Sequence, residues 1–556
     1  MSSIQNFNLG ILGHVDSGKT SIAKAISTLA STAAFDKNPQ SLDRGITLDL
    51  GFSTFNLLID HNVGDIQVTL IDCPGHASLI KTVIGGSQIM NAALIIIDVT
   101  KGIQTQTAEC IVLAEILNLP TVIVLNKVDL LDQATLSHKL QKVTKSIQKA
   151  LNSTIFHNSQ YVVFSAKHAN SDLTSNQYIQ SLNNSIKQLV KSHFLNVPQP
   201  HEIAKNSNHI SSLDSFIFAY EHCFNIKGKG TILTGTLLQG VLAVDDNVQI
   251  LPSRVNSKVK SIQRFKQPVS KINIGDRAGI CLAKVNSDGI ERGFVATPNS
   301  IKSAQYCIAN VCVIKYYQSV LKSHTSFHVS IGYDTVLAKA VFMELVPGPE
   351  CAQHEDLIAP EYKIVDEIDS KTSNINHLFV YLSWNKQVFV PEKTLIIGSK
   401  LDSDNNTKSC RLAFYGKDPF LICGKAYKDW SYNDLKLFRI KNKTGNIQRI
   451  VDENTLIGIG MFGESSIIPF LGFKVDVKKE GNTIATGKID STFGKGEKFK
   501  IIFPPKVNIK ALIEAELASH NEANKKTKIS EYLDQLFLSL DYRKFISKKS
   551  LVDQKF

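Results

Sequence analysis

The stretch GHVDSGKT, residues 13–20, constrains the fold more than any other part of this sequence. It matches the pattern GxxxxGK[ST] and lies between an apolar run, FNLGIL, and a segment with helical spacing. In such a loop the glycines let backbone amides surround phosphate oxygens, the lysine adds positive charge, and the last hydroxyl can bind Mg²⁺. We therefore predict a nucleotide-phosphate site that consists of Gly13, His14, Val15, Asp16, Ser17, Gly18, Lys19 and Thr20.

Residues 1 to about 200 have the pattern of an α/β domain. Five apolar runs typical of strands alternate with segments of helical spacing: FNLGIL, IQVTLID, ALIIIDV, TVIVL and YVVF. Such alternation indicates a doubly wound sheet, in which ligands bind at the carboxyl ends of the strands. Each remaining motif of the predicted nucleotide site should therefore follow a strand.

Three further motifs do stand at these strand ends. DCPGH begins at Asp72, whose carboxylate can hold the Mg²⁺ shell. NKVD ends at Asp129, which can accept two hydrogen bonds from guanine N1 and N2, a pattern that adenine cannot supply. SAK fits the loop that closes over the base. The motifs add these residues to a predicted GTP site: Asp72, Gly75, Asn126, Lys127, Asp129, Ser165, Ala166 and Lys167.

The rest of this chain of 556 residues is too long for one core and reads as three mainly β domains. Short apolar runs broken by glycines predict small antiparallel barrels over 211–298 and 299–420. The proline-rich, acidic segment at about 346–369 is expected to be an exposed insertion rather than a core strand. A basic β-rich domain is expected over 421–556, ending in a helix at 528–546 whose apolar residues share one face.

Charge and cysteines indicate where such a chain works. From Leu421 onward there are 24 Lys and Arg against 16 Asp and Glu, so +8 of the net +12 lies there. This fits a solvated surface and a polyanionic partner equally well. The nine cysteines form no CxxC pair, and neither a secretory signal nor an apolar run of about 20 residues is apparent. We expect a cytoplasmic protein without a membrane partner.

The motifs resemble those of the translation-factor GTPases. Residues 41–52, SLDRGITLDLGF, are similar to the first switch loop of that family, with Thr47 at the position that senses the γ-phosphate through Mg²⁺. Thr20, Thr47 and Asp72 are then the implied metal ligands. In DCPGH a histidine stands where Ras-type enzymes carry glutamine, and the resemblance implies that His76 orients the attacking water.

Three more positions match this family. Val15 and Ile46 match an apolar gate that holds the histidine back until a ribosome docks, and Asp16 matches a residue that helps to neutralise phosphate charge. The resemblance therefore implies a GTPase that uses GTP and Mg²⁺ and turns over slowly until a ribosome stimulates it.

A narrower resemblance is to the eukaryotic selenocysteine-specific elongation factors. It implies delivery of selenocysteinyl-tRNA to the ribosome at recoded UGA codons, a protein adaptor on the messenger's recoding element, and a monomer. The first switch is similar in length to that of this group and shorter than that of the general factor. The resemblance rests on 31–52, 222–236, 272–281, 437–462 and 491–503, and it is thin in the third domain.

By this resemblance an aminoacyl pocket maps onto Phe52, Glu221, His222 and Arg277. A selenol ionises well below the ~8.5 of a thiol, so a pocket that selects it should be basic. Arg277 would supply permanent charge, His222 a second donor, Glu221 an acceptor for the α-amino group, and Phe52 a wall. The family carries aspartate where this chain has Glu221. Because strand neighbours point to opposite faces, Glu221 and His222 share a pocket only if their strand is bulged or ends there.

Three other functions remain open from the sequence. A general elongation factor or a tRNA-binding initiation subunit is disfavoured by the short first switch, Arg277 and the basic last domain. The GTPase subunit of a sulfate-activating complex would not need a fourth domain. An RNA-binding adaptor with a regulatory GTPase fits the basic charge but lacks an RNA-recognition signature.

Overall fold

The computed structural model describes most of the chain and divides it into two compact units, residues 1–343 with 365–430 and residues 344–364 with 431–556. The described residues are 5–30, 49–59, 65–76, 80–132, 134, 136–169, 176–196, 215–226, 228, 230–332, 334–346, 361–369, 377–391, 394–401, 410–417, 419–423, 435–463, 467–494, 497–523 and 529–546.

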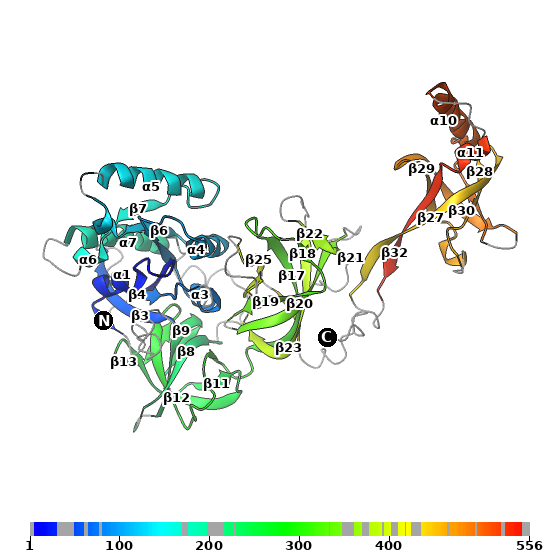
Figure 1. Ribbon diagram of the computed structural model, residues 1–556. Coiled ribbons are helices and arrows are strands. Elements are labelled where there is room, and N and C mark those ends of the chain that lie inside the picture. The colour runs from blue at the N-terminus through cyan, green and yellow to red at the C-terminus, as the bar shows by residue number, and fades with distance from the viewer. Residues whose placement is uncertain are drawn as a thin grey trace. The chain divides into compact units, whose positions relative to one another are not determined.

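The first domain is a seven-stranded sheet covered by helices on both faces (Figure 1). Its strand order is β2-β3-β4-β1-β5-β6-β7, and all neighbours from β4 to β7 run parallel. The strands are β1 Gln5–Gly13, β2 Leu29–Ala30, β3 Gly51–Leu58, β4 Asp65–Asp72, β5 Ala92–Asp98, β6 Thr121–Asn126 and β7 Gln160–Val163. The helices are α1 Lys19–Ile26, α3 Ile80–Ser87, α4 Thr105–Ile116, η2 Val128–Leu130, α5 Leu136–Leu151, α6 Ala166–Ala169 and α7 Asn176–Asn196.

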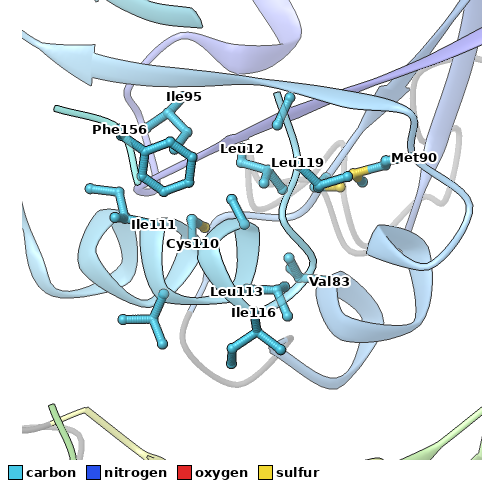
Figure 2. Packing of buried hydrophobic residues seen from close by; sticks show 14 of the residues in the cluster. Leu12, Val83, Met90, Ile95, Cys110, Ile111, Leu113, Ile116, Leu119 and Phe156 are labelled. Atoms are coloured by element: carbon cyan, nitrogen blue, oxygen red, sulfur yellow. The ribbon is translucent and has the colours of Figure 1, made fainter. Parts of the chain in front are cut away.

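Strand β5 shows why these runs form a buried sheet. Leu94 and Ile96 pack on the face covered by α1 and α7, while Ile95 and Ile97 pack on the face covered by α3, α4 and α5. Figure 2 shows the second face, where Cys110, Ile111, Leu113 and Ile116 of α4 lie among Leu12, Ile95 and Leu119. The α/β domain and all five of its predicted strands are confirmed.

The second domain is a closed antiparallel barrel in which β11 pairs with both β16 and β12. Its strands are β8 Ile217–Ile226, β9 Gly230–Gln239, β11 Asn247–Leu251, β12 Val255–Arg264, β13 Gln267–Val269, β15 Arg277–Leu282 and β16 Gly293–Ala296. A separate ladder joins β10 Val241–Ala243 to β14 Lys271–Asn273.

The third domain is another barrel, which closes where β19 pairs with both β24 and β20. Its strands are β17 Lys302–Val313, β18 Leu321–Lys322, β19 Thr325–Ile331, β20 Asp334–Leu345, β22 Glu367–Ile368, β23 Leu378–Val390, β24 Leu395–Ser399, β25 Leu412–Lys417 and β26 Phe420–Cys423. Because β26 pairs with β17, the predicted domain boundary after residue 420 is wrong by at least three residues.

The third domain docks on α4 of the first. Ile314, Leu395 and Leu412 join the apolar cluster beneath that helix. Beside them Arg411 donates two hydrogen bonds to Glu109, from Nε to Oε1 at 2.8 Å and from Nη2 to Oε2 at 2.7 Å. Both side chains are buried, so this ion pair is a bidentate, desolvated link between the two domains.

The second unit contains a third barrel, closed by pairing of β27 with both β28 and β32. Its strands are β21 Tyr362–Ile364, β27 Leu437–Asp452, β28 Thr455–Ile459, β29 Lys474–Lys479, β30 Asn482–Thr492, β31 Phe499–Ile502 and β32 Phe537–Phe545. Its helices are η6 Ile468–Phe470, α10 Ile509–Ala523 and α11 Ile529–Leu533. The predicted series of β-barrel domains after an α/β domain is confirmed.

The predicted C-terminal helix is mostly wrong. The helix predicted over 528–546 ends at Leu533, and Phe537–Phe545 is strand β32. Leu538 and Leu540 are buried and both pair with β27, and Leu538 also pairs with β29, so cross-strand burial overrides the helical spacing.

The acidic segment is not wholly an exposed insertion. Residues 347–360 lie outside the described residues. In the part that follows, Tyr362 and Ile368 are buried, β21 pairs in parallel with β27, and β22 pairs with β18. Residues 344–364 therefore belong to the second unit, which makes the third domain discontinuous in sequence.

Candidate functional site

The P-loop lies at the carboxyl end of β1, as expected for an open α/β sheet. Lys19 is buried and donates to the His14 carbonyl at 2.6 Å. Burial lowers its pKa although Asp72 opposes the shift, so the site is short of the negative charge that a phosphate would supply. Gly75 closes the site from the DCPGH loop, where an added Cβ would stand 2.7 Å from the Val15 nitrogen.

Thr20 and Asp72 meet on the metal side of this loop. The Thr20 hydroxyl donates to Asp72 Oδ2 at 2.6 Å, which joins the first turn of α1 to the end of β4. A hydroxyl and a carboxylate are hard oxygen donors of the kind Mg²⁺ prefers, so this pair fits the predicted ion. The third implied ligand, Thr47, lies outside the described residues, as does the gate residue Ile46. Within the described ranges no cluster of three or more His, Cys, Asp or Glu side chains forms a separate metal site.

Asn126 connects the phosphate and base ends of the site. Its Nδ2 donates to the Ser17 carbonyl at 2.8 Å, and its Oδ1 accepts from the Ala166 amide at 3.3 Å. Asp129 is held by the Ser165 hydroxyl, which donates to Oδ1 at 2.6 Å. The structure thus brings three motifs that are far apart in sequence into one site.

Lys127 has a left-handed backbone, with φ of 66°, and its ammonium lies 2.9 Å from Asp98 at the end of β5. Burial opposes ionisation of Asp98, but hydrogen bonds from Thr100 and Lys127 hold its pKa below the usual value. Asp98 therefore anchors the base loop in its charged form, a role that the sequence motifs did not predict. Its position at the end of the strand ALIIID could have indicated that it belongs to the site.

The residues predicted to act on the γ-phosphate lie at the open edge of the site. His76 is exposed, Asp16 is exposed with a left-handed φ of 59°, and Val15 is half-buried. Lys167 follows Ala166 at the start of α6, next to the base loop. An exposed histidine at the end of the DCPGH turn can approach water without first leaving a packed core.

A second site lies on the barrel of the second domain, where β8 is bulged. Tyr220 pairs with Gly235 and His222 pairs with Thr234, so Glu221 is an extra residue on β8. The bulge returns His222 to the barrel face that carries Ala219 and Thr236, the partners in register with Arg277. Glu221 and His222 therefore point to one face, which is the condition that the sequence required of a shared pocket.

Arg277 and Glu221 form the buried centre of this site. Arg277 Nη1 donates to Glu221 Oε2 at 2.9 Å and to the Thr236 hydroxyl at 3.4 Å. The guanidinium carbon lies 3.1 Å from the ring centroid of Phe52, which comes from β3 of the first domain. Burial raises the pKa of Glu221, and the charge of Arg277 opposes that shift.

His222 completes the site and also contacts the first domain. Its Nδ1 lies 3.7 Å from Asp49 Oδ2, and its ring meets that of Phe52 edge to face at 6.3 Å. Burial lowers the pKa of His222, and Asp49 opposes the shift. All four predicted pocket residues are therefore brought together by the structure.

Four buried polar atoms in this site have no hydrogen-bond partner among the residues that the structure describes: Glu221 Oε1, His222 Nε2, Thr234 Oγ1 and Arg277 Nη2. Buried polar atoms are nearly always satisfied in native proteins, so four in one place indicate a polar ligand. The sequence did not predict that Thr234 belongs to this site, because its place there depends on the register in which it pairs with His222 across the bulge.

The sheet, P-loop and base loop define a GTPase, and residues 4–199 match the family model of the elongation factor Tu GTP binding domain. Residues 230–297 match elongation factor Tu domain 2. Residues 308–416 match the third domain of eukaryotic selenocysteine-specific elongation factors, and residues 433–550 match the eEFSec C-terminal RIFT domain.

Two relatives agree with these domains, one over nearly the whole chain and one over part of it. The selenocysteine-specific elongation factor of Mus musculus is 35% identical over 97% of this chain and 97% of its own length. That of Methanocaldococcus jannaschii is 36% identical over 61% of this chain and 66% of its own. The chain therefore belongs to the selenocysteine-specific elongation factors and is a translation GTPase that binds GTP.

A solved structure shares the fold. Translation elongation factor SelB from Methanococcus maripaludis, in complex with the GTP analogue GppNHp, covers 98% of this chain with a TM-score of 0.68 and 22% identity, and all of its own chain is covered. None of the helices formed by the described residues has the length and apolar character to cross a bilayer.

Proposed function

We propose that this protein carries selenocysteinyl-tRNA with GTP to the ribosome at recoded UGA codons and hydrolyses GTP when it docks. The observation that carries this proposal is the buried Arg277 pocket with its unpartnered polar atoms. At neutral pH a selenol is an anion while serine is neutral and a thiol is mostly protonated, so a basic pocket separates the three.

The unpartnered atoms match the groups of a selenocysteinyl ester. Arg277 Nη2 and His222 Nε2 are donors for the selenolate, while Nη1 stays on Glu221. Glu221 Oε1 is an acceptor for the α-ammonium group. The ligand would thus satisfy atoms that are already desolvated, so binding incurs little further desolvation of the protein.

Nucleotide state and pocket are connected through β3. Asp49 and Phe52 are the last part of the first switch region, residues 41–52, and they contact His222 and Arg277. An ordered switch with GTP would fix both contacts, and a displaced switch with GDP would remove one wall of the pocket and one partner of His222. This supports release of the aminoacyl group after hydrolysis.

The nucleotide site supports slow hydrolysis until docking. Mg²⁺ would be held by the Thr20 hydroxyl, Asp72 and Thr47, and when bound it offsets charge on the β- and γ-phosphates. Lys19 and the P-loop amides add to that stabilisation. His76 orients the attacking water, and the Val15–Ile46 gate limits its approach.

This proposal also includes a partner, an oligomeric state and a location. A protein adaptor on the recoding element of the messenger would bind the carrier, which acts as a monomer in the cytoplasm. The basic charge of 421–556 supports a polyanionic neighbour in such an assembly.

A binding comparison tests the proposed function. In the presence of GTP, selenocysteinyl-tRNA should bind much more tightly than bulk aminoacyl-tRNA, and GDP should abolish the difference. Similar affinity for both tRNA pools would instead identify a general carrier. Filter binding with labelled tRNA provides the measurement.

The lowered pKa of His222 predicts how binding depends on pH. In the free protein His222 is neutral at pH 7 because its pKa lies below the ordinary 6.5, and an adjacent selenolate would raise that pKa again. Binding then takes up a proton, so affinity for selenocysteinyl-tRNA should rise as pH falls from about 8 to about 6. In the His222→Gln variant the same titration should be shallower, since only the α-amino group of the aminoacyl ester still titrates in this range, and an unchanged slope would exclude His222 as the proton acceptor.

A further inference from the structure

Two asparagines occupy a strand that should be apolar. Strand β1 is central and parallel to both neighbours, a position where strands are normally continuous apolar runs. Yet Asn6 is only partly exposed and Asn8 is 2% exposed. Burying an amide is unfavourable unless its donors and acceptors are bonded, so their partners indicate why they are there.

Both side chains bind one backbone atom of the second domain. Asn6 Nδ2 donates to the Gly275 carbonyl at 2.8 Å, and Asn8 Nδ2 donates to the same oxygen at 3.2 Å. Asn6 Nδ2 also donates to Asn8 Oδ1 at 2.8 Å, while the Thr69 hydroxyl on β4 donates to Asn6 Oδ1 at 2.7 Å. The two amides are therefore oriented by each other and by the neighbouring strand. We call this pair with its bonds to Gly275 the asparagine clamp.

The clamped carbonyl belongs to the turn that leads into Arg277. Gly275 has a left-handed φ of 86°, and its amide donates to the Leu237 carbonyl at 2.8 Å. Asp276 is buried, accepts from the Asn273 amide at 2.9 Å and pairs with Arg264 at 3.2 Å. Arg277 follows as the first residue of β15. Because these bonds fix the backbone of the turn, they also limit the positions that the Arg277 guanidinium can occupy.

The clamp and Phe52 lie along the same face of the first sheet. Phe52 is in register with Ile71 of β4, and Thr69, two residues earlier on β4, is in register with Asn8. The Arg277 segment thus touches the first domain at two points, its guanidinium on Phe52 and its preceding turn on the clamp. The two points differ in origin, since Phe52 is the last residue of the first switch region whereas the clamp belongs to the strands β1 and β4.

We propose that Asn6 and Asn8 are positioning residues for the aminoacyl pocket, fixing the Arg277 turn to a part of the GTPase domain that does not respond to nucleotide. The inference rests on the proposed function of the pocket. The clamp keeps the charged end of the pocket in place with either nucleotide, so GTP controls affinity only through the wall formed by Phe52 and Asp49.

The test uses the full-length protein with Asn6→Ala and Asn8→Ala combined, and Gln67→Ala as the matched control. Gln67 is in register with Asn6 on β4 and is also buried, but its side chain is not one of those that bind Gly275. The double variant should bind selenocysteinyl-tRNA about tenfold more weakly, because two hydrogen bonds that orient the turn are gone. Its affinity for the same tRNA carrying serine and for GTP should change little, as should every affinity of the control.

Hydrogen exchange at the Gly275 amide gives a second readout that needs no tRNA. The clamp predicts faster exchange there in the double variant than in wild type and control, and Asn6→Ala alone serves if the double variant does not fold. Equal exchange in all variants, or equal losses for both charged tRNAs, overturns the proposal. Wild-type protein that does not discriminate selenocysteine from serine would refute the pocket's function instead, while the exchange result would still decide the clamp.

Discussion

Arg277→Gln is expected to weaken binding of selenocysteinyl-tRNA by about 10- to 100-fold, the effect of losing a charged hydrogen-bond donor to an anion. Binding of the same tRNA carrying serine should fall by much less, since serine offers the guanidinium no charge. The reason is geometric as well as electrostatic, because Arg277 lies between Glu221 and Phe52 and directs its unpartnered Nη2 into the pocket. Competition filter binding with the two charged forms of one tRNA measures both losses.

The control for this variant addresses Glu221. Removing Arg277 alone leaves a buried carboxylate uncompensated, which destabilises a protein by about 3–5 kcal/mol. Combining Arg277→Gln with Glu221→Gln removes that charge, so the double variant should regain stability without regaining discrimination. Equal losses for selenocysteine and serine in both variants would argue against an anion-reading pocket.

His76→Ala is expected to lower ribosome-stimulated GTP hydrolysis by about 10²- to 10⁴-fold, the range for losing a group that positions or activates the nucleophile. GTP affinity should be unchanged, because His76 is exposed beside the loop, whereas the residues that we propose to hold the nucleotide, Lys19 and Asn126, are buried. Single-turnover hydrolysis with and without ribosomes measures the effect.

His138→Ala is the matched control, since this histidine is exposed on α5 of the same domain, away from the motif loops. It should hydrolyse GTP at the wild-type rate under stimulation. A His76→Ala protein that keeps the full stimulated rate would mean that another group orients the water.

The structure brings together most of the residues predicted for the nucleotide site, because the chemistry of each motif is local. A glycine-rich turn, a carboxylate at a strand end and an NKVD loop each place their own groups, and the parallel sheet brings them together. Asp98 escaped prediction because its role depends on Lys127 reaching across from the next strand.

The pocket could be predicted only in part, because it depends on register. The sequence shows Glu221 beside His222 but does not show the bulge that turns both to one face or places Thr234 opposite His222. Strand register was also the missing information in the last predicted helix. There Leu538 and Leu540 fit a helical stripe in sequence, and only pairing with β27 and β29 makes them a strand.

The most direct test of the proposed aminoacyl pocket compares two affinities of the wild-type protein with GTP at pH 7.5. One is for a tRNA charged with selenocysteine, and the other is for the same tRNA charged with serine. The tRNA body is constant, so any difference arises at the aminoacyl end, where Arg277, His222 and Glu221 have buried atoms without a partner among the described residues. We predict a clear preference for selenocysteine that weakens in Arg277→Gln. Equal affinities for the two charged forms would contradict it.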